Sequence, residues 1–242
     1  MSASAKMGHN KTGAQMSPEE IKQQLEANEL FPPDIPGDAT AIAEARKQTI
    51  SAADPIGTVP VPGSVKGMVK TSFEKMMGKN PEILIDKMAE RLAFERTGVR
   101  LYDAMLAKIA ALGNIPGPTD VEPVIQQFRD EEHQHFLLLV AAMEKLGADP
   151  TAQTPCADLA GVTAQGLMKV ITDPRTNLAQ SMNALLIAEA ADNVGWELLV
   201  GLAKEAGHDH MADDFSAALA EENQHMATIK EFMKHAAVAE LL

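Results

Sequence analysis

Two hexapeptides, DEEHQH and AEENQH, occupy matching places 90 residues apart in the chain. Each contains a Glu-x-x-His pair, and the two pairs are Glu132 with His135 and Glu222 with His225. Residues three apart in an α-helix lie on the same face, where a carboxylate and an imidazole can reach one metal ion. A single such pair carries little information in a helical protein. Two pairs in matching local sequence predict a shared metal site.

The two hexapeptides also limit which residues form the pairs. Asp130 and His133 have the same spacing in the first segment and compete there as ligands. Their counterparts in the second segment are Ala220 and Asn223, which removes this alternative if the two halves are equivalent. Following the helical spacing outward from each Glu-x-x-His pair gives apolar residues on both sides. Both pairs are therefore predicted to face a core, where the charge of the carboxylates must be neutralised.

Two further glutamates lie inside apolar helical stripes. They are Glu95 and Glu189, and an aromatic residue follows each by seven positions, Tyr102 in one helix and Trp196 in the other. Each glutamate is followed, after a distance that suits a helical hairpin, by one of the Glu-x-x-His pairs. For the two aromatic residues, plain packing and a supporting role beside the metals, through a hydrogen bond or electron transfer, are both compatible with the sequence.

One Glu from each of two helices and Glu-x-x-His from each of two others is the ligand set of ferritin-like di-iron and di-manganese carboxylate proteins. Over residues 81–240 the chain resembles this superfamily, which includes bacterioferritins and rubrerythrins. The tyrosine seven residues after the first glutamate is similar to the bacterioferritin pattern. The resemblance implies six metal ligands, which are Glu95, Glu132, His135, Glu189, Glu222 and His225.

The resemblance implies an all-α fold, a ferritin-like four-helix bundle with a long crossover between core helices two and three. Breaks in the pattern at Gly, Pro and capping residues predict where the helices begin and end. The expected core helices are residues 81–112 with Asn80 as N-cap, 121–147, a third from Asp173-Pro174 to about 207, and a fourth from about 210 onward. The crossover, 148–175, is predicted to contain a short helix at 157–172.

Residues 1–80 are predicted to form a separate, partly disordered N-terminal arm, and residues 81–242 the bundle. The arm is interrupted by Pro- and Gly-rich stretches and lacks the apolar surface to fold alone. We expect it to drape over the bundle or over a neighbouring subunit, as in a homodimer. Short helices are predicted at 18–29, 40–51 and 64–79.

Composition narrows the classes of partner. A formal net charge of −13 argues against nucleic acid and against anionic membranes. No apolar run approaches the length of a membrane span, and the polar first residues do not resemble a signal peptide. The expected location is therefore the cytoplasm. Cys156 is the only cysteine, which excludes the paired Cys-x-x-Cys of a rubredoxin module, so any electron donor is expected to be a separate molecule.

The four carboxylates supply four negative charges, which balance the positive charge of two divalent ions, and each of the two imidazoles can bind one of these ions. Such hard oxygen ligands, with one imidazole for each metal, favour iron, with manganese as the next choice. The resemblance implies a non-haem oxidoreductase that reacts with hydrogen peroxide or O2, as a peroxidase or ferroxidase. Manganese catalase-like disproportionation of peroxide, oxygenation of an organic substrate, and non-enzymatic iron storage or metal buffering remain as alternatives.

Overall fold

The structure is a computed structural model that describes the chain except for residues 1–7, 10–11, 36, 62–79, 114–119 and 242. All of its regular elements in the described residues are helical. Contacts divide the chain into two units, residues 4–55 and residues 56–242. The helices are η1 (Ala14–Met16), α1 (Pro18–Leu30), α2 (Thr40–Ala52), α4 (Pro81–Leu112), α5 (Val121–Leu146), α6 (Pro155–Thr172), α7 (Leu178–Glu205) and α8 (Asp209–Leu241).

The first unit contains the short helices α1 and α2, close to the segments expected at 18–29 and 40–51. Neither helix contains a buried residue. Their apolar side chains are few, so these helices have no core of their own to pack around. The helix expected at 64–79 lies outside the described residues. The division of the chain at residue 80 therefore stays a prediction.

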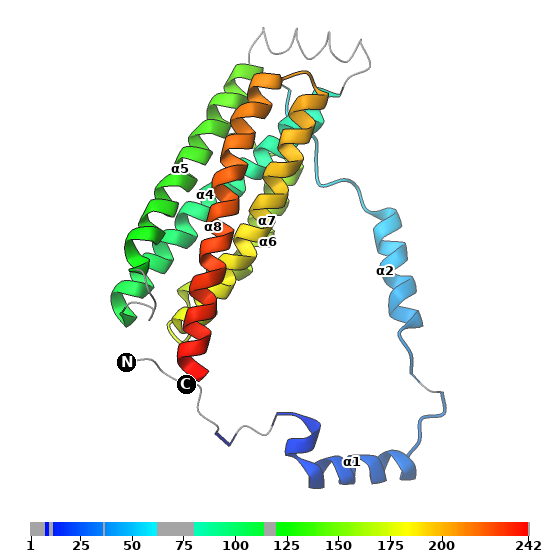
Figure 1. Cartoon of the computed structure of the whole chain (residues 1–242). Helices are drawn as coiled ribbons and strands as arrows, with labels where there is room; N and C mark the ends of the chain where they lie inside the picture. The colour runs from blue at the N-terminus through cyan, green and yellow to red at the C-terminus, as the bar shows by residue number, and fades with distance from the viewer. Residues whose placement is uncertain (1–7, 10–11, 36, 62–79, 114–119, 242) are drawn as a thin grey trace. The chain divides into compact units, whose positions relative to one another are not determined.

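Four long helices of the second unit form the predicted bundle (Figure 1). α4 packs against α5 and α7, and α8 packs against α7 and α5, so that each helix has two neighbours. α5 and α7 run in the same direction, and α6 carries the chain back between them while packing on α4 and α7. This is the long crossover of a ferritin-like arrangement, and the predicted fold class is confirmed.

The bundle has two apolar clusters, one toward each end of its helices. The first cluster includes Met88, Leu139, Met143, Trp196 and Phe215. The second includes Leu101, Met105, Ile125, Phe128, Met182 and Ile229. The six predicted ligands belong to neither cluster, and along each helix they fall between the residues of the two. The fold therefore encloses a polar layer between two apolar layers, which seal it from water.

The helix ends agree with the predicted breaks, with two corrections. α7 begins at Leu178, later than the expected Asp173-Pro174, because Asn177 and Gln180 form a capping box whose reciprocal hydrogen bonds start the helix there. Asn80 occupies the N-cap position of α4, but its side chain makes no capping hydrogen bond. α5 ends as expected at Gly147, whose φ of 84° is in the left-handed region that glycine adopts without strain.

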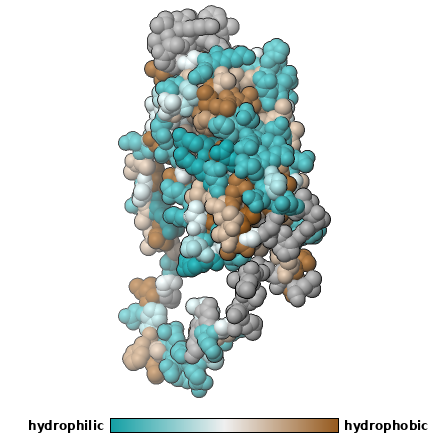
Figure 2. Space-filling view, turned by 90° about the vertical axis from the view of Figure 1, so that its left-hand side faces the viewer, coloured by the Kyte–Doolittle hydropathy of each residue, from teal (hydrophilic) through white to brown (hydrophobic). Residues whose placement is uncertain are grey.

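No helix among the described residues combines the length and the apolar character needed to cross a lipid bilayer. Figure 2 views the bundle from the side of α5 and shows a mainly hydrophilic surface with separate hydrophobic patches. The exposed apolar side chains on α5 and α7 include Leu137, Ile187, Val194 and Leu198.

Lys108 ties the end of α4 to the turn between α6 and α7. Its ammonium donates to the carbonyl oxygens of Asp173 at 2.9 Å and Thr176 at 3.0 Å, and also to the Thr176 hydroxyl. The side chain is only 9% exposed, so water replaces these contacts poorly. The crossover is thereby fixed at the point where it enters α7.

Lys108→Met should lower the free energy of unfolding by about 1–3 kcal/mol, because two carbonyl groups lose their charged donor in a poorly solvated turn. Chemical denaturation followed by circular dichroism measures the change. Lys230→Met, which removes an exposed lysine from α8, is the control and should change stability by less than about 0.5 kcal/mol. Equal effects of the two substitutions would contradict the assignment.

Candidate metal centre

The polar layer brings all six predicted ligands together from the four core helices. Each residue offers one ligand atom, and these atoms lie within 4.8 Å of one another in overlapping groups. One group is Glu132, Glu189, Glu222 and His225, and another is Glu95, His135 and Glu222. Glu222 belongs to both groups. All six side chains are buried, with at most 3% of their surface exposed.

The two histidines are oriented in the same way. Nδ1 of His135 faces the cluster, 2.6 Å from Glu222 Oε1, and Nδ1 of His225 lies 3.5–3.7 Å from oxygens of Glu132, Glu189 and Glu222. The opposite nitrogen of each ring is held by a carboxylate from the neighbouring helix. Donation of the Nε2 proton to that carboxylate leaves the Nδ1 lone pair directed inward, as a metal ligand requires.

The carboxylates that hold the imidazoles are related by the sequence repeat. His225 Nε2 lies 2.7 Å from Glu131 Oε2, and His135 Nε2 lies 2.8 Å from Glu221 Oε2. Glu131 directly precedes the predicted ligand Glu132 on α5, and Glu221 directly precedes the predicted ligand Glu222 on α8. Asp130, which precedes Glu131, does not have this role, because it is exposed and pairs with Arg129. Aligning the two hexapeptides could have identified Glu221.

Most of the oxygen and nitrogen atoms in this cluster that could bind a metal ion have no hydrogen-bond partner within the protein. The buried atoms without a partner include both carboxylate oxygens of Glu95, Glu132 and Glu222, Oε2 of Glu189, and Nδ1 of both His135 and His225. Buried polar atoms in folded proteins are almost always paired, and an isolated buried charge is costly. Convergent oxygen and imidazole donors without partners fit divalent metal ions. The cluster is therefore a candidate site for two metal ions.

Without metal, the carboxylates cannot all ionise. Burial, together with repulsion from neighbouring carboxylates, raises the pKa of Glu95, Glu132 and Glu189 well above the ordinary value. Burial also opposes ionisation of Glu222, but the close approach of the two histidine rings outweighs it and lowers the pKa of Glu222 to about 2. For His225, burial favours the neutral ring, whereas contact with Glu222 raises its pKa to about 9. The metal-free cluster thus retains protons that bound metal would displace.

The two aromatic residues predicted to lie near the site do so in different ways. The Tyr102 hydroxyl donates to Glu189 Oε1 at 2.6 Å, so it holds one predicted ligand from across the bundle. Trp196 packs edge-on against the His135 ring at 5.6 Å between centroids and against Phe215 at 5.4 Å. Its indole nitrogen has no hydrogen-bond partner. Tyr102 therefore contacts a ligand through a polar group, and Trp196 contacts one through its ring surface.

A buried ion pair beside the cluster was not anticipated from the sequence. Arg91 and Asp192 are 5% and 2% exposed, and Arg91 Nη1 lies 2.7 Å from Asp192 Oδ1. Arg91 Nε also lies 3.5 Å from Glu95 Oε1. Asp192 is close enough to Glu95, Glu132 and Glu222 to form a further group of potential ligand atoms. The structure thus places Asp192 in the interior, beside the cluster.

Two glycines make room for this arrangement. A Cβ on Gly195 would lie 2.0 Å from Arg91 Nη1, and a Cβ on Gly98 would lie 2.2 Å from Glu132 Oε2. Gly98 follows Glu95 by three residues, as Asp192 follows Glu189. The two halves of the bundle therefore differ at this position. In one half Gly98 leaves space for Glu132, and in the other half Asp192 adds a fifth buried carboxylate. Single-sequence patterns do not show which charged groups approach a glycine in space.

Comparisons with known proteins give one point of similarity. No family model matches the chain, and no curated protein does. Among solved structures, the chain is similar to a ferritin-like, diiron-carboxylate protein from Bacillus anthracis str. Ames, with 17% sequence identity and a TM-score of 0.48. The match covers 62% of this chain and 94% of the other.

The metal-free protein should become less stable as pH rises from about 5 to 9. Asp192, whose pKa burial raises from 3.8 to about 7, and His225, whose pKa rises from 6.5 to about 9, bind protons more tightly when folded. Both contributions to stability are lost as pH rises through these ranges. The lowered pKa of Glu222 affects stability only below about pH 4.5, so it does not alter the expected loss of stability between pH 5 and 9.

Thermal melts in the presence of a chelator measure this slope. The same protein loaded with Mn²⁺ is the control, since it keeps the same surface charge while its ligands are deprotonated. Its melting temperature should be higher and should depend less on pH. Parallel slopes with and without metal would show that surface repulsion, and not the buried cluster, causes the pH dependence.

The Arg91–Asp192 pair should control the net charge of the site. Asp192→Asn leaves Arg91 uncompensated beside Glu95 and should weaken Mn²⁺ or Co²⁺ binding roughly tenfold or more. Arg91→Met should not weaken binding, because it removes a positive charge. Combining Arg91→Met with Asp192→Asn should restore affinity toward that of the wild type. Calorimetric titration measures these affinities. Weakening in all three variants would indicate that the pair only supports packing.

Proposed function

We propose that the protein binds two metal ions in the buried cluster and acts as a non-haem oxidoreductase toward hydrogen peroxide or O2. The observation that carries this proposal is the convergence of unpartnered buried donors, four glutamates and two histidine Nδ1 atoms, in one layer of a ferritin-like bundle. Four glutamates contribute four negative charges, which two divalent ions balance. Glu95, Glu132, His135, Glu189, Glu222 and His225 would hold these ions.

Iron is the preferred metal and manganese the second choice, because carboxylates dominate the donor set. Two such ions would supply the two electrons that reduce hydrogen peroxide to water, or O2 to hydrogen peroxide. Zinc, which prefers fewer oxygen ligands and has no redox chemistry, fits the proposed activity less well.

The residues of the chain would set the conditions for this chemistry. Glu131 and Glu221 hold the Nε2 atoms of the two imidazoles and direct Nδ1 inward. The Tyr102 hydroxyl donates a hydrogen bond to Glu189 and so holds this carboxylate within the polar layer. The apolar clusters on both sides exclude bulk water, so the electrostatic interactions inside are strong. Asn193 donates to the backbone oxygens of Glu189 and Glu222 and joins two ligand-bearing helices.

A redox cycle needs a source of electrons. The only cysteine, Cys156, is not part of the cluster, and its thiol pKa is raised to about 11, mainly by burial. The proposal therefore includes a separate electron donor. Disproportionation of peroxide, as in a manganese catalase, would need no such donor, and iron storage would need capacity beyond two ions. Both alternatives are outcomes of the experiment below.

The test is anaerobic titration of the metal-free protein with Fe²⁺, followed by addition of hydrogen peroxide. We expect binding to saturate at two ions per chain and oxidation within seconds, with a near-ultraviolet absorbance that saturates at the same stoichiometry. An added reductant should allow further turnovers. Glu132→Gln combined with Glu222→Gln should lose this stoichiometry, whereas Glu197→Gln, which changes an exposed residue of α7, should not.

The other outcomes distinguish the alternatives. Oxidation of tens of Fe²⁺ per chain with retained mineral would favour storage. Release of O2 from peroxide by the Mn²⁺-loaded protein, with no reductant consumed, would favour disproportionation. Full loading of the double variant with two metal ions would refute the assigned ligands.

A further inference from the structure

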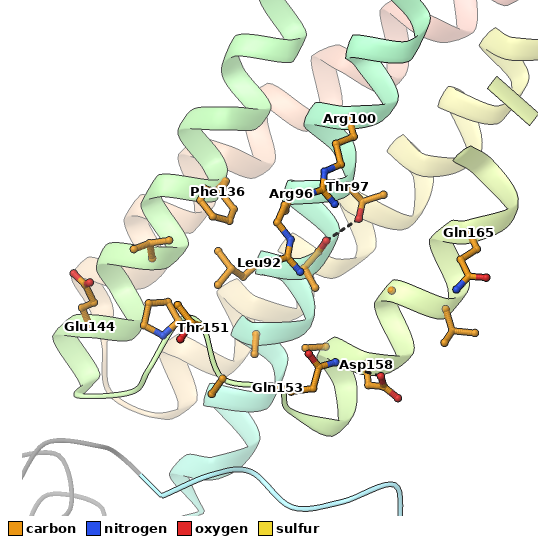
Figure 3. A pocket seen from close by; sticks show the side chains of 18 residues that line it. Leu92, Arg96, Thr97, Arg100, Phe136, Glu144, Thr151, Gln153, Asp158 and Gln165 are labelled. Carbon is orange, nitrogen blue, oxygen red and sulfur yellow. Dashed lines mark hydrogen bonds between the residues drawn. The ribbon is translucent and has the colours of Figure 1, made fainter. Parts of the chain in front are cut away.

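A cavity lies outside the polar layer, and none of the six proposed ligands lines it. It has a volume of about 700 Å³ and lies between α4, α5, α6 and the loop that joins α5 to α6. Figure 3 shows α4 at the back of the cavity, with α5 on one side and α6 on the other. Cavities of this size accommodate small organic molecules.

Small residues create this space. Ala89 and Ala93 of α4, with Ala157 and Gly161 of α6, line the cavity where the two helices approach each other. A Cβ on Gly161 would find no atom within 4 Å. Larger apolar side chains, Leu92 from α4 and Phe136 and Val140 from α5, form the rest of an apolar wall.

Two arginines mark one end of the cavity. Arg96 and Arg100 are four residues apart on α4, and both side chains run along the helix toward its N-terminus and into the cavity (Figure 3). The other three arginines of the described bundle, Arg91, Arg129 and Arg175, form ion pairs with aspartates. Within the described part of the chain, Arg96 and Arg100 have no such partner.

Both arginine side chains are exposed, so a ligand can reach them from solvent. The chain has 34 acidic and 21 basic residues, so carboxylates are plentiful, yet these two neighbouring guanidinium groups face the cavity without one. Like charges four residues apart on a helix repel each other. A bound oxyanion would remove the repulsion and could accept paired hydrogen bonds from the planar guanidinium groups.

The opposite end of the cavity carries negative charge. Asp158 and Glu144 lie there, with Thr151 and Gln153 of the loop, and Gln153 donates to Asp158 at 3.2 Å. Carboxylates at this end disfavour a second anionic group. The distribution of charge therefore orients a ligand, with its anionic group at the arginines and its body along Leu92 and Phe136.

We propose that this cavity binds a small organic oxyanion, a carboxylate or phosphate monoester attached to an apolar body. Arg96 and Arg100 hold the oxyanion, and the wall formed by Leu92, Phe136 and Val140 contacts the apolar body. The site is separate from the metal centre, and the inference does not depend on the proposed redox activity.

Binding of octanoate and octyl phosphate to the full chain tests the proposal, measured by calorimetry and ligand-observed NMR at low ionic strength. Both anions should bind at least about tenfold more tightly than octanol or octylammonium, because only they pair with the arginines. Arg96→Gln combined with Arg100→Gln should remove that preference. Arg46→Gln combined with Lys47→Gln, which removes two positive charges from exposed positions of α2, is the matched charge control and should retain it.

A second pair of variants tests the cavity itself. Gly161→Leu places a side chain in the space, and Gly166→Leu makes the same change on α6 at a residue that does not line the cavity. Replacing glycine in a helix interior does not destabilise the helix, so both variants should fold. Only Gly161→Leu should abolish binding of the anions.

Three results would overturn the proposal. Equal binding of octanol and octanoate would indicate a simple apolar surface. Equal loss of binding in the two glycine variants would place the ligand elsewhere. A dimer in sedimentation experiments that Gly161→Leu dissociates would show that the cavity is an interface between two copies of the chain.

Discussion

Burial of several carboxylates in one layer of an apolar bundle is the constraint on which the rest of the structure depends. Glu95, Glu132, Glu189 and Glu222 have at most 2% of their surface exposed, and they face one another across the four helices. Such a layer is unfavourable unless protons, cations or hydrogen bonds compensate for the charge. Both histidines, Tyr102 and the Arg91–Asp192 pair contact the layer and supply part of that compensation. The donors that remain without partners are those that metal ions would satisfy.

The near-repeat of the sequence produces an approximately twofold arrangement that is broken in specific places. The reciprocal contacts of Glu131 with His225 and Glu221 with His135 follow the repeat. Tyr102 and Trp196 are equivalent in sequence but differ in their contacts, since Tyr102 donates a hydrogen bond to Glu189 and Trp196 packs against the His135 ring. Gly98 and Asp192 are also equivalent, and only one half of the site contains the additional carboxylate. The two proposed metal positions therefore have similar ligands but different surroundings, which would make them chemically inequivalent.

The candidate metal centre and the arginine-lined cavity use α4 in different ways. Glu95 points into the bundle, whereas Arg96 and Arg100 lie on the face between α5 and α6. The crossover makes the second site possible, because α6 packs beside α4 and its small residues leave a space there. A crossover without a helix would lack this wall. The same element that gives the bundle its connectivity thus also forms a separate binding surface.

The sequence by itself determined the helical fold, the ends of most core helices and the six residues that converge in the polar layer. It could do so because helical periodicity places Glu95, Glu132, Glu189 and Glu222 inside apolar stripes, and a local repeat relates the two histidines. Tertiary structure alone decided the buried position of Asp192, its pairing with Arg91 and the need for glycine at residues 98 and 195. The arginine-lined cavity is likewise a tertiary feature, because its lining combines Arg96 and Arg100 of α4 with residues of α5, α6 and the loop between them. These features depend on which helices approach each other and how closely, and such distances between remote segments are not encoded in local spacing.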